Sequence, residues 1–558
     1  MRLVALVVAA LALAPAALAD TNPLAPPKPG KPLSTQTQVI RVFRDYPKVA
    51  SWLKRYPPGP ATTATFSQGV WTVNVWSRQV EVATGRVDDT TTGVLEAWTG
   101  PQVAWKMARG YSGAFGGEKI NSYPVWLAFC GIFLLGLVDW RRPLSVRNVD
   151  LLVLLSFSVS LWFFNRGHVF AAMSLAYPPL VWLLLRCVWI ARRDRGPSGA
   201  ATWPVWILAA ATVFLAGFRV GLNVRASNVI DVGYSGVIGA DRIMHGQSPY
   251  GHFPVEDPQP KCGLADSEGE VRDRIQTNGR CETANPLGDT YGPVSYLAYL
   301  PGYWVFGWSG HWDTLPAVHL TSILFDSIAL IGLALVGRRF GGPRLGATLA
   351  FAWVAWPFTQ YASSSNTNDA IAPALLVWGF LAVTRPGGRA VAVAVSGWTK
   401  FASLLLVPLW AGYPRPPRGF VRYALWFLAA TLLVFFVLFL EPSPLHAARV
   451  FYDRTVAFQV ERDSPFSLWD WGQYHARGLP DLHLVQRVLQ VLLVAGALAL
   501  AWLPRRRSPL RLAALTAAVL VGFELVLTHW FYLYLPWFFP FVALALIGPL
   551  PGETQQAA

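Results

Sequence analysis

This chain of 558 residues carries few charges for its length, and acidic residues are the scarcer kind. Charged side chains make up 14% of the sequence, with 31 Asp and Glu against 46 Lys and Arg, whereas apolar residues make up 53%. The apolar residues stand in long runs, and their total exceeds what one soluble core could bury. The composition therefore excludes a single soluble domain and predicts an α-helical polytopic membrane protein.

The sequence also lacks the motifs of nucleotide chemistry. It contains no Gly-rich phosphate loop followed by Lys and Ser or Thr, and no Asp-x-Asp pair in a segment predicted to face outside. These absences disfavour a nucleotide-sugar enzyme with a bound divalent metal. We predict no cofactor, and a requirement for a divalent metal stays open.

The net charge of +15 does not indicate nucleic acid, because arginines cluster briefly at the ends of apolar runs instead of forming a stripe. By the positive-inside rule these clusters mark cytoplasmic turns. The clusters are Arg141/Arg142/Arg147, Arg192/Arg193/Arg195, Arg338/Arg339/Arg344, Arg385/Arg389, Arg415/Arg418 and residues 505–507. We therefore expect a multi-pass protein of the cell membrane with its tail, residues 550–558, in the cytoplasm.

Apolar runs long enough for membrane helices follow residue 123. They cover residues 125–138, 151–164, 169–190, 203–222, 314–336, 345–358, 371–384, 424–440, 484–503, 512–527 and 531–547. Two further apolar runs, if they crossed the membrane fully, would place basic clusters on the wrong side. We therefore interpret residues 293–306 as interfacial or re-entrant and residues 390–410 as a hairpin of two short helices. We expect 11 to 13 membrane segments in all: four form an N-terminal group (124–222), and the rest form a core (290–549).

The first part of the chain is predicted to be exported. Residues 1–19 fit a secretory signal peptide, and residues 20–123 an exported α+β domain. In that domain residues 37–56 suit an amphipathic helix, and three strands follow at 71–76, 79–87 and 93–98. The order of a helix and then a meander, with the segments 84–87 and 92–96 as turn-and-strand units, resembles PepSY-like domains. A structural appendage and a binding or inhibitory module are both open.

Four cysteines are present, and two of them fall in predicted membrane spans. The other two, Cys262 and Cys281, lie in a polar loop of the predicted extracytoplasmic segment 223–289. Metal ligation lacks a nearby His at ligand spacing, whereas an exported loop suits a disulfide. We predict a disulfide between Cys262 and Cys281 and no metal site.

An acidic residue, Asp231, stands just beyond the apolar run 203–222, at the mouth of a predicted membrane helix. A charge in that place is a functional candidate, although a helix cap or a partner for Arg225 would also explain it. Asp241 is the second acidic candidate, and its neighbour Arg242 favours a local ion pair there.

The residues around Asp231 carry a family resemblance. Asp231, Tyr234, Gly246, Pro249 and Tyr250 are followed by the segments 290–293 (Thr-Tyr-Gly-Pro) and 397–400 (Gly-Trp-Thr-Lys). This pattern, across residues 203–547, resembles glycosyltransferase family 87 of the GT-C superfamily, whose members use polyprenol-phosphate-mannose. The resemblance implies that Asp231 is the general base. It also implies a polyprenyl-phosphate sugar donor, with mannose as the sugar, and a glycolipid, glycan or protein acceptor on the outer face.

Such a donor needs cations near its phosphate, and the predicted outer loops 360–369 and 441–483 are where they should be sought. Arg454 and Arg462 fit this role, as do Lys400 at the hairpin tip and His529 at the end of the run 512–527. Tyr234 and Tyr250 are candidates for substrate contact. An interfacial helix, lysine snorkelling and an aromatic belt are the plainer readings of these residues.

Two other function classes share this topology. A transporter or flippase for a lipid-linked precursor should show matching halves with broken helices, and no such repeat is visible in the sequence. An envelope scaffold would need no carboxylate at the membrane surface. Both alternatives predict that Asp231→Asn keeps its function.

Overall fold

A computed structural model of the chain describes residues 31–110, 113, 115–196, 202–251, 274–275, 281–282, 288–310, 314–414, 419–462, 464–474 and 480–547. The chain divides into two compact units, Met1–Thr99 and Gly100–Ala558, which are taken in turn. The expected signal peptide, Cys262 and the tail 550–558 lie outside the described residues, and only the backbone of Cys281 is described. The disulfide therefore stays a prediction.

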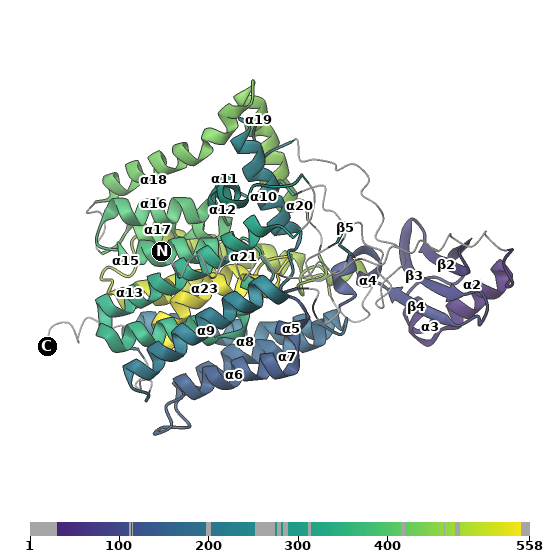
Figure 1. Cartoon of the computed structure of the whole chain (residues 1–558), viewed down its shortest axis with the longest axis horizontal. Helices are drawn as coiled ribbons and strands as arrows, with labels where there is room; N and C mark the ends of the chain where they lie inside the picture. Colours follow the sequence, from purple (N-terminus) through teal and green to yellow (C-terminus); the bar gives the residue numbers. More distant parts are fainter. Residues whose placement is uncertain are drawn as a thin grey trace, which may run out of the picture. The chain divides into compact units, whose positions relative to one another are not determined.

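The first unit is a small α+β fold, as predicted (Figure 1). Its elements are α2 (Gln36–Asp45), α3 (Pro47–Leu53), β1 (Ala61–Ser67), β2 (Val70–Ser77), β3 (Val80–Asp88) and β4 (Val94–Thr99). The strands form an antiparallel meander in the order β1-β2-β3-β4. Val39 and Phe43, one helical turn apart on α2, are fully buried with Val73 and Val75 of β2 and form the core with them.

Two details of this unit differ from the prediction. The expected helix over residues 37–56 is two helices, because Pro47 holds Tyr46 in an extended conformation (φ −59°, ψ 129°) and ends the first helix there. Strand β1 was not predicted. It is an edge strand of mostly Thr and Ala in which only Ala64 is buried, so it lacks the alternation of large apolar residues that marks a strand.

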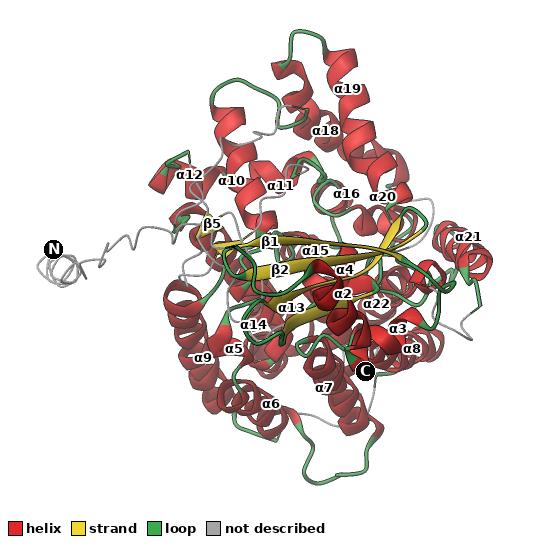
Figure 2. Cartoon of the chain, turned by 90° about the vertical axis from the view of Figure 1, so that its right-hand side faces the viewer, coloured by secondary structure: helices red, strands yellow, loops and turns green. Residues whose placement is uncertain are grey.

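The second unit is almost entirely helical (Figure 2). Among the described residues, five helices are long and apolar enough to cross a membrane, and the protein is a helical membrane protein. They are α7 (Val146–Phe164), α8 (Val169–Arg193), α9 (Val205–Ala226), α13 (Pro316–Ala355) and α18 with η3 (Phe420–Leu440). Shorter apolar helices are α6 (Tyr123–Leu137), α15 (Ile371–Leu381), the pair η2 and α17 (Phe401–Ala411), α21 (His483–Ala499) and the segment Tyr532–Ile547. The count of 11 to 13 membrane segments remains a prediction.

The two irregular runs form short helices, and the interfacial or re-entrant placement of residues 293–306 stays a prediction. Residues 293–306 form two short helices, α11 (Pro293–Leu297) and α12 (Leu300–Phe306). Residues 390–410 belong to α16 (Pro386–Gly397) and to η2 (Phe401–Leu406) and α17 (Val407–Ala411), which fold back onto it. The runs 314–336 and 345–358 lie mainly in α13, whose backbone is non-helical at Gly341 and Gly342, just before Pro343.

The remaining elements connect these helices and place the site. Most are short: α4 (Pro101–Ala104), η1 (Lys106–Ala108), α5 (Glu118–Asn121), α10 (Asp231–Met244), β5 (Arg274–Ile275), β6 (Cys281–Glu282), α14 (Pro357–Ser364), α19 (Pro444–Tyr452), η4 (Asp453–Ala457), α20 (Phe458–Glu461), η5 (Trp471–Tyr474), α22 (Pro509–Leu525), η6 (Tyr532–Tyr534), α23 (Leu535–Val542) and η7 (Ala543–Ile547). In the core α13 packs on α9, α15 on both α13 and α16, and α22 on α8. The turns after α14 and α16 and the start of α10 carry the polar residues considered next.

Candidate functional site

The site is built around a buried ion pair between Lys400 and Asp369. The Lys400 Nζ lies 3.0 Å from Asp369 Oδ1. Lys400 is 8% exposed and Asp369 1% exposed. Lys400 stands where α16 breaks before η2, and Asp369 stands in the turn between α14 and α15. The sequence offered Lys400 no acidic neighbour, so its partner comes from a distant turn.

Three aromatic rings surround the ammonium group of Lys400. The Nζ atom lies 4.6 Å from the ring centre of Tyr291, 5.4 Å from that of Trp537 and 5.9 Å from that of Tyr534. The indole N–H of Trp537 also donates a hydrogen bond to Asp369 Oδ1, at 3.0 Å. Cation–π attraction and this bond hold both charges in fixed positions.

The turn that carries Asp369 is tied to the end of α9. Asn366 has a left-handed backbone (φ 52°), which Asn tolerates better than most residues. Its side-chain N–H group donates to Ser227 Oγ and to the carbonyl of Asn228, both at 2.8 Å, and its Oδ1 accepts from Asn223 at 2.9 Å. These bonds fix the turn of Asp369 beside the chain that leads into α10.

Asp231 is the first residue of α10 and lies at the edge of this cluster. It is half-buried, and its Oδ1 accepts the N–H of the next residue, Val232, at 2.9 Å. Its charge acts on Lys400, Tyr291 and Tyr534. A Cβ atom at position 233 would collide with the Asn366 carbonyl, so Gly233 is what lets the first turn of α10 approach this closely.

Arg462 and His529 add positive and titratable groups on the same side. The Arg462 guanidinium lies 5.5 Å from the ring centre of Trp105, and its Nε has no hydrogen-bond partner among the described residues. His529 Nδ1 lies 2.9 Å from Ser464 Oγ. Burial lowers the pKa of His529 well below its usual value, and the charges of Arg462 and Lys400 lower this pKa further. At neutral pH His529 is therefore uncharged.

Asn368, beside Asp369, supplies polar atoms that the described protein leaves unused. Its side chain is 1% exposed and donates to Ser295 Oγ at 3.2 Å, while its Oδ1 has no partner in the described part of the chain. Ser295 in turn donates to the carbonyl of Thr399, next to Lys400, at 3.0 Å. A buried acceptor without a donor is costly, and it suits a ligand hydroxyl.

Arg454 and Tyr250 belong to a neighbouring network that supports the cluster from outside. Arg454 Nε lies 3.0 Å from Asp289 Oδ2, which also accepts the N–H of Gly251 at 2.9 Å. The hydroxyl of Tyr250 donates to the carbonyl of Tyr291 at 2.9 Å. Arg454 is thus occupied by a carboxylate, and Tyr250 holds the residue whose ring covers Lys400.

Asp241 and Tyr234 are placed elsewhere on α10. Asp241 accepts a hydrogen bond of 2.6 Å from the Tyr303 hydroxyl. It stands ten residues after Asp231, about 15 Å along the helix by the rise of 1.5 Å per residue. Tyr234 packs edge-on against Trp308, with ring centres 5.9 Å apart. Of the two acidic candidates, Asp231 is the one beside the Lys400 pair.

The sequence left part of this site unrecognised. The sequence predicts the outer loop 360–369 but assigns no role to Asp369 within it, and it does not single out Trp537. A signal for Asp369 was present, because it is the only acidic residue between Ser327 and Leu440. No comparable signal marked Trp537, since aromatic residues fill the whole segment around it.

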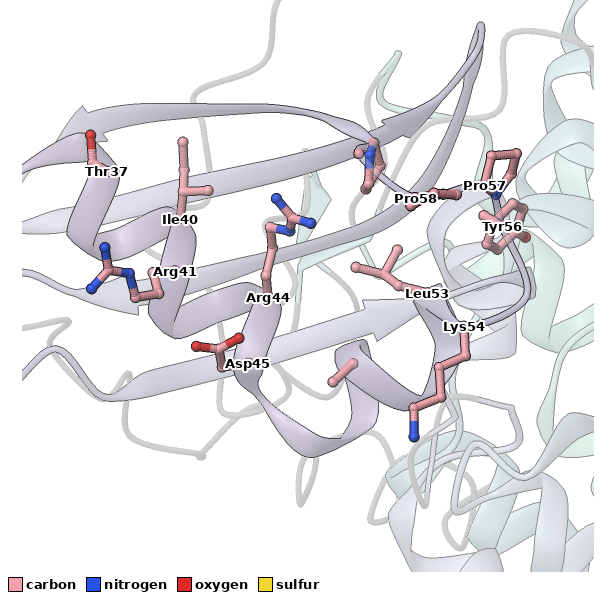
Figure 3. A pocket seen from close by; sticks show the side chains of 13 residues that line it. Thr37, Ile40, Arg41, Arg44, Asp45, Leu53, Lys54, Tyr56, Pro57 and Pro58 are labelled. Atoms are coloured by element: carbon pink, nitrogen blue, oxygen red, sulfur yellow. The ribbon is translucent and has the colours of Figure 1, made fainter.

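A separate hollow lies in the first unit (Figure 3). Its volume is about 590 Å³, and α2, α3 and residues 56–60 line it. Arg41, Arg44 and Lys54 contribute positive charge there, and Asp45 contributes one negative charge. The hollow belongs to the first unit alone, and export of that unit stays a prediction.

Neither a metal cluster nor a known relative identifies the site. Among the described residues, no group of three His, Cys, Asp or Glu side chains is arranged to hold a metal ion. No protein family model matches the chain, and no curated protein matches it either.

Proposed function

We propose that this protein is a GT-C-type membrane glycosyltransferase that moves a sugar from a polyprenyl-phosphate donor to an acceptor of the cell envelope, on the extracytoplasmic face. Mannose is the sugar that the family resemblance implies. The proposed site consists of Asp231, Lys400, Asp369, Arg462 and His529.

One observation carries the proposal. Asp231, Lys400, Arg462 and His529 come from four distant segments, and each was a candidate for the base or the donor phosphate on sequence grounds. In the fold the charges of Asp231 and Arg462 act on Lys400, and those of Arg462 and Lys400 act on the uncharged His529. A structural helix cap and an interfacial arginine would have no reason to meet there.

The chemistry follows from these groups. The acceptor hydroxyl attacks the anomeric carbon, its proton passes to the Asp231 carboxylate, and the bond between that carbon and the phosphate oxygen breaks. The lipid phosphate leaves with the electron pair and gains negative charge. Because Asp369 already holds Lys400, Arg462 is the cation best able to turn toward the phosphate, while Lys400 sets the local potential.

The uncharged polar groups of the site suit the sugar itself. The unpartnered Oδ1 of Asn368 can accept a sugar hydroxyl, and the rings of Tyr291 and Tyr534, both half-buried, can stack on an apolar sugar face. These contacts orient the anomeric carbon, which contributes rate by fixing the geometry of attack.

The test is an in vitro transfer assay with polyprenyl-phosphate mannose and membrane acceptors. We expect Asp231→Asn to lower kcat by about 100- to 10,000-fold, the range for loss of a general base, with little change in thermal stability. Asp241→Asn is the matched control on the same helix. It should keep its activity, because its carboxylate contacts Tyr303 and lies away from the Lys400 pair.

Two outcomes would contradict the proposal in different ways. Full transfer by Asp231→Asn would remove Asp231 as the base. If the wild-type protein transferred no lipid-linked sugar at all, then a transporter or a scaffold would explain the fold better, and a flipping assay with the same lipid would separate those two.

A further inference from the structure

An apolar groove lies on the membrane unit between α15, α16 and α18. Its volume is about 800 Å³, and its walls include Leu375, Trp378, Val391, Val395 and Trp426. In both views these three helices lie together, and they pack on one another in the order α15, α16, α18 (Figures 1 and 2). Trp378 and Trp426 are 40% and 53% exposed, so the groove is open along its side.

Glycines on α15 and α16 shape this groove. A Cβ atom at position 387 would lie 2.9 Å from Trp426 Cδ1, and one at position 388 would lie 2.8 Å from the Cβ of Ala382. A Cβ at position 379 would collide with Ala392. Larger residues at these positions would force the helices apart, so the close approach depends on Gly.

Arginines without partners line one end of the groove. Arg385 and Arg422 are both exposed, and neither side chain has a hydrogen bond or an ion pair among the described residues. Arg339 lies beside them and donates to Thr384, another lining residue, at 3.2 Å. This end of the groove is therefore strongly basic.

The surrounding sequence offers no acidic residue to neutralise this charge. Residues 327–440 contain eight arginines and a single acidic residue, Asp369, which pairs with Lys400. The eight are Arg338, Arg339, Arg344, Arg385, Arg389, Arg415, Arg418 and Arg422. The counter-charge for this end of the groove therefore comes from outside the segment, and an anion attached to an apolar body would fit both the arginines and the apolar walls.

We propose that the groove binds an anionic phospholipid. Its phosphate lies between Arg385 and Arg422, and an acyl chain runs along Val391 and Val395 toward Trp378. Arginine forks match phosphate oxygens, and each basic side chain near a membrane surface adds attraction to anionic lipid. By the positive-inside rule this end faces the cytoplasm, which is opposite to the side of the Lys400 pair.

The test uses the purified full-length protein in detergent, titrated with phosphatidylglycerol or phosphatidylcholine and observed by native mass spectrometry. We expect the wild type to retain phosphatidylglycerol preferentially. The double variant Arg385→Gln/Arg422→Gln should retain it about ten- to thirtyfold less, while its weak retention of phosphatidylcholine stays unchanged. Arg192→Gln/Arg195→Gln removes the same charge from the end of α8 and should behave as the wild type.

A second variant tests the apolar part of the site independently. Val391→Trp fills the groove and keeps both arginines, so it should lower the retention of phosphatidylglycerol at least severalfold. The inference is overturned if the double variant retains phosphatidylglycerol as the wild type does, or if the α8 control loses it equally. It is also overturned if the wild type retains phosphatidylglycerol no better than phosphatidylcholine, or if Val391→Trp retains phosphatidylglycerol as the wild type does.

Discussion

The two ends of α16 each hold a buried cation, and the two cations differ in what they contact. Arg389, fully buried near the first residue of the helix, donates to the carbonyls of Trp410, Val383 and Tyr413 at 3.1, 2.6 and 2.8 Å. Lys400, just past the other end, faces the Asp369 carboxylate and three aromatic rings. The two positions are about 16 Å apart by helical rise.

The different partners indicate a structural role for Arg389 and a role in the proposed site for Lys400. Arg389 donates to buried carbonyls at and just beyond the ends of α15 and α17, and Arg147 and Arg507 donate in the same way to Ile547 at 2.9 Å and Leu409 at 3.0 Å. Such arginines join elements. A buried pair such as Lys400–Asp369 adds little net stability, because desolvation offsets its attraction. Under the proposed function the pair acts through the charge that it presents to a ligand.

The largest effect should follow from removing Lys400. Lys400→Met should lower sugar transfer by about 100- to 1000-fold, the range for losing one preorganised electrostatic contact. It should also lower the free energy of unfolding by about 3 kcal/mol, because Asp369 is left buried and unpaired. Transfer assays and thermal unfolding in detergent measure the two effects separately.

The matched control is the double variant Lys400→Met/Asp369→Asn. It leaves no unpaired charge, so it should regain most of the stability and none of the transfer. If transfer returned together with stability, then the pair would be structural and the contrast with Arg389 would disappear.

Arg389→Met should lower stability and leave transfer by each folded molecule nearly unchanged. Three buried carbonyls would lose their donors, which costs about 3 kcal/mol or more of unfolding free energy, while kcat per folded molecule stays within about twofold. Active-site titration combined with thermal unfolding distinguishes a smaller folded fraction from a lower kcat of each folded molecule. Arg192→Met, at an exposed position on α8, should change stability by no more than about 0.5 kcal/mol. A loss of kcat in folded Arg389→Met would extend the site across the whole length of α16.

Arg462→Gln should affect binding of the donor. Its guanidinium has an unsatisfied Nε and stands beside the proposed phosphate position, so its loss should raise the KM for the donor about tenfold. Arg449→Gln, an exposed position on α19, is the control and should leave KM unchanged. If both variants raised KM equally, then Arg462 would act only through the overall surface charge and would not contact the donor phosphate.

The contrast between the ends of α16 was only half visible in the sequence. Local patterns indicated the break near Lys400, because the run 390–410 did not fit the alternation of sides, and the strand order β2-β3-β4 followed from alternation and turns. Local patterns also placed Asp231 at a helix mouth. Each of these features depends on residues near one another in the chain.

The partners could not be predicted, because they depend on packing between distant segments. Asp369 meets Lys400 only when α15 and α16 lie side by side, and Asn366 fixes that turn by reaching back to Ser227 and Asn228. Arg454 looked as suitable for phosphate as Arg462 did, yet Asp289 occupies it. The type and spacing of charged residues predict candidates for the site, whereas the packing of distant segments determines which candidates lie together.

The smallest predicted effect is the pH dependence of stability that His529, near the Lys400 end of α16, should produce. Burial, with the charges of Arg462 and Lys400, keeps the pKa of His529 well below its usual value. His529 is therefore protonated near pH 6.5 in the unfolded chain, whereas in the folded chain it stays neutral to a lower pH. The contribution of His529 to the free energy of unfolding is fully present above about pH 6.5. It decreases below that pH, by at most about 1.4 kcal/mol per pH unit. Thermal unfolding from pH 7.5 to 5 should show this slope in the wild type and a weaker slope in His529→Gln. His446→Gln, at an exposed position on α19, should keep the wild-type slope, and an unchanged slope in His529→Gln would mean that the fold does not lower the pKa of His529.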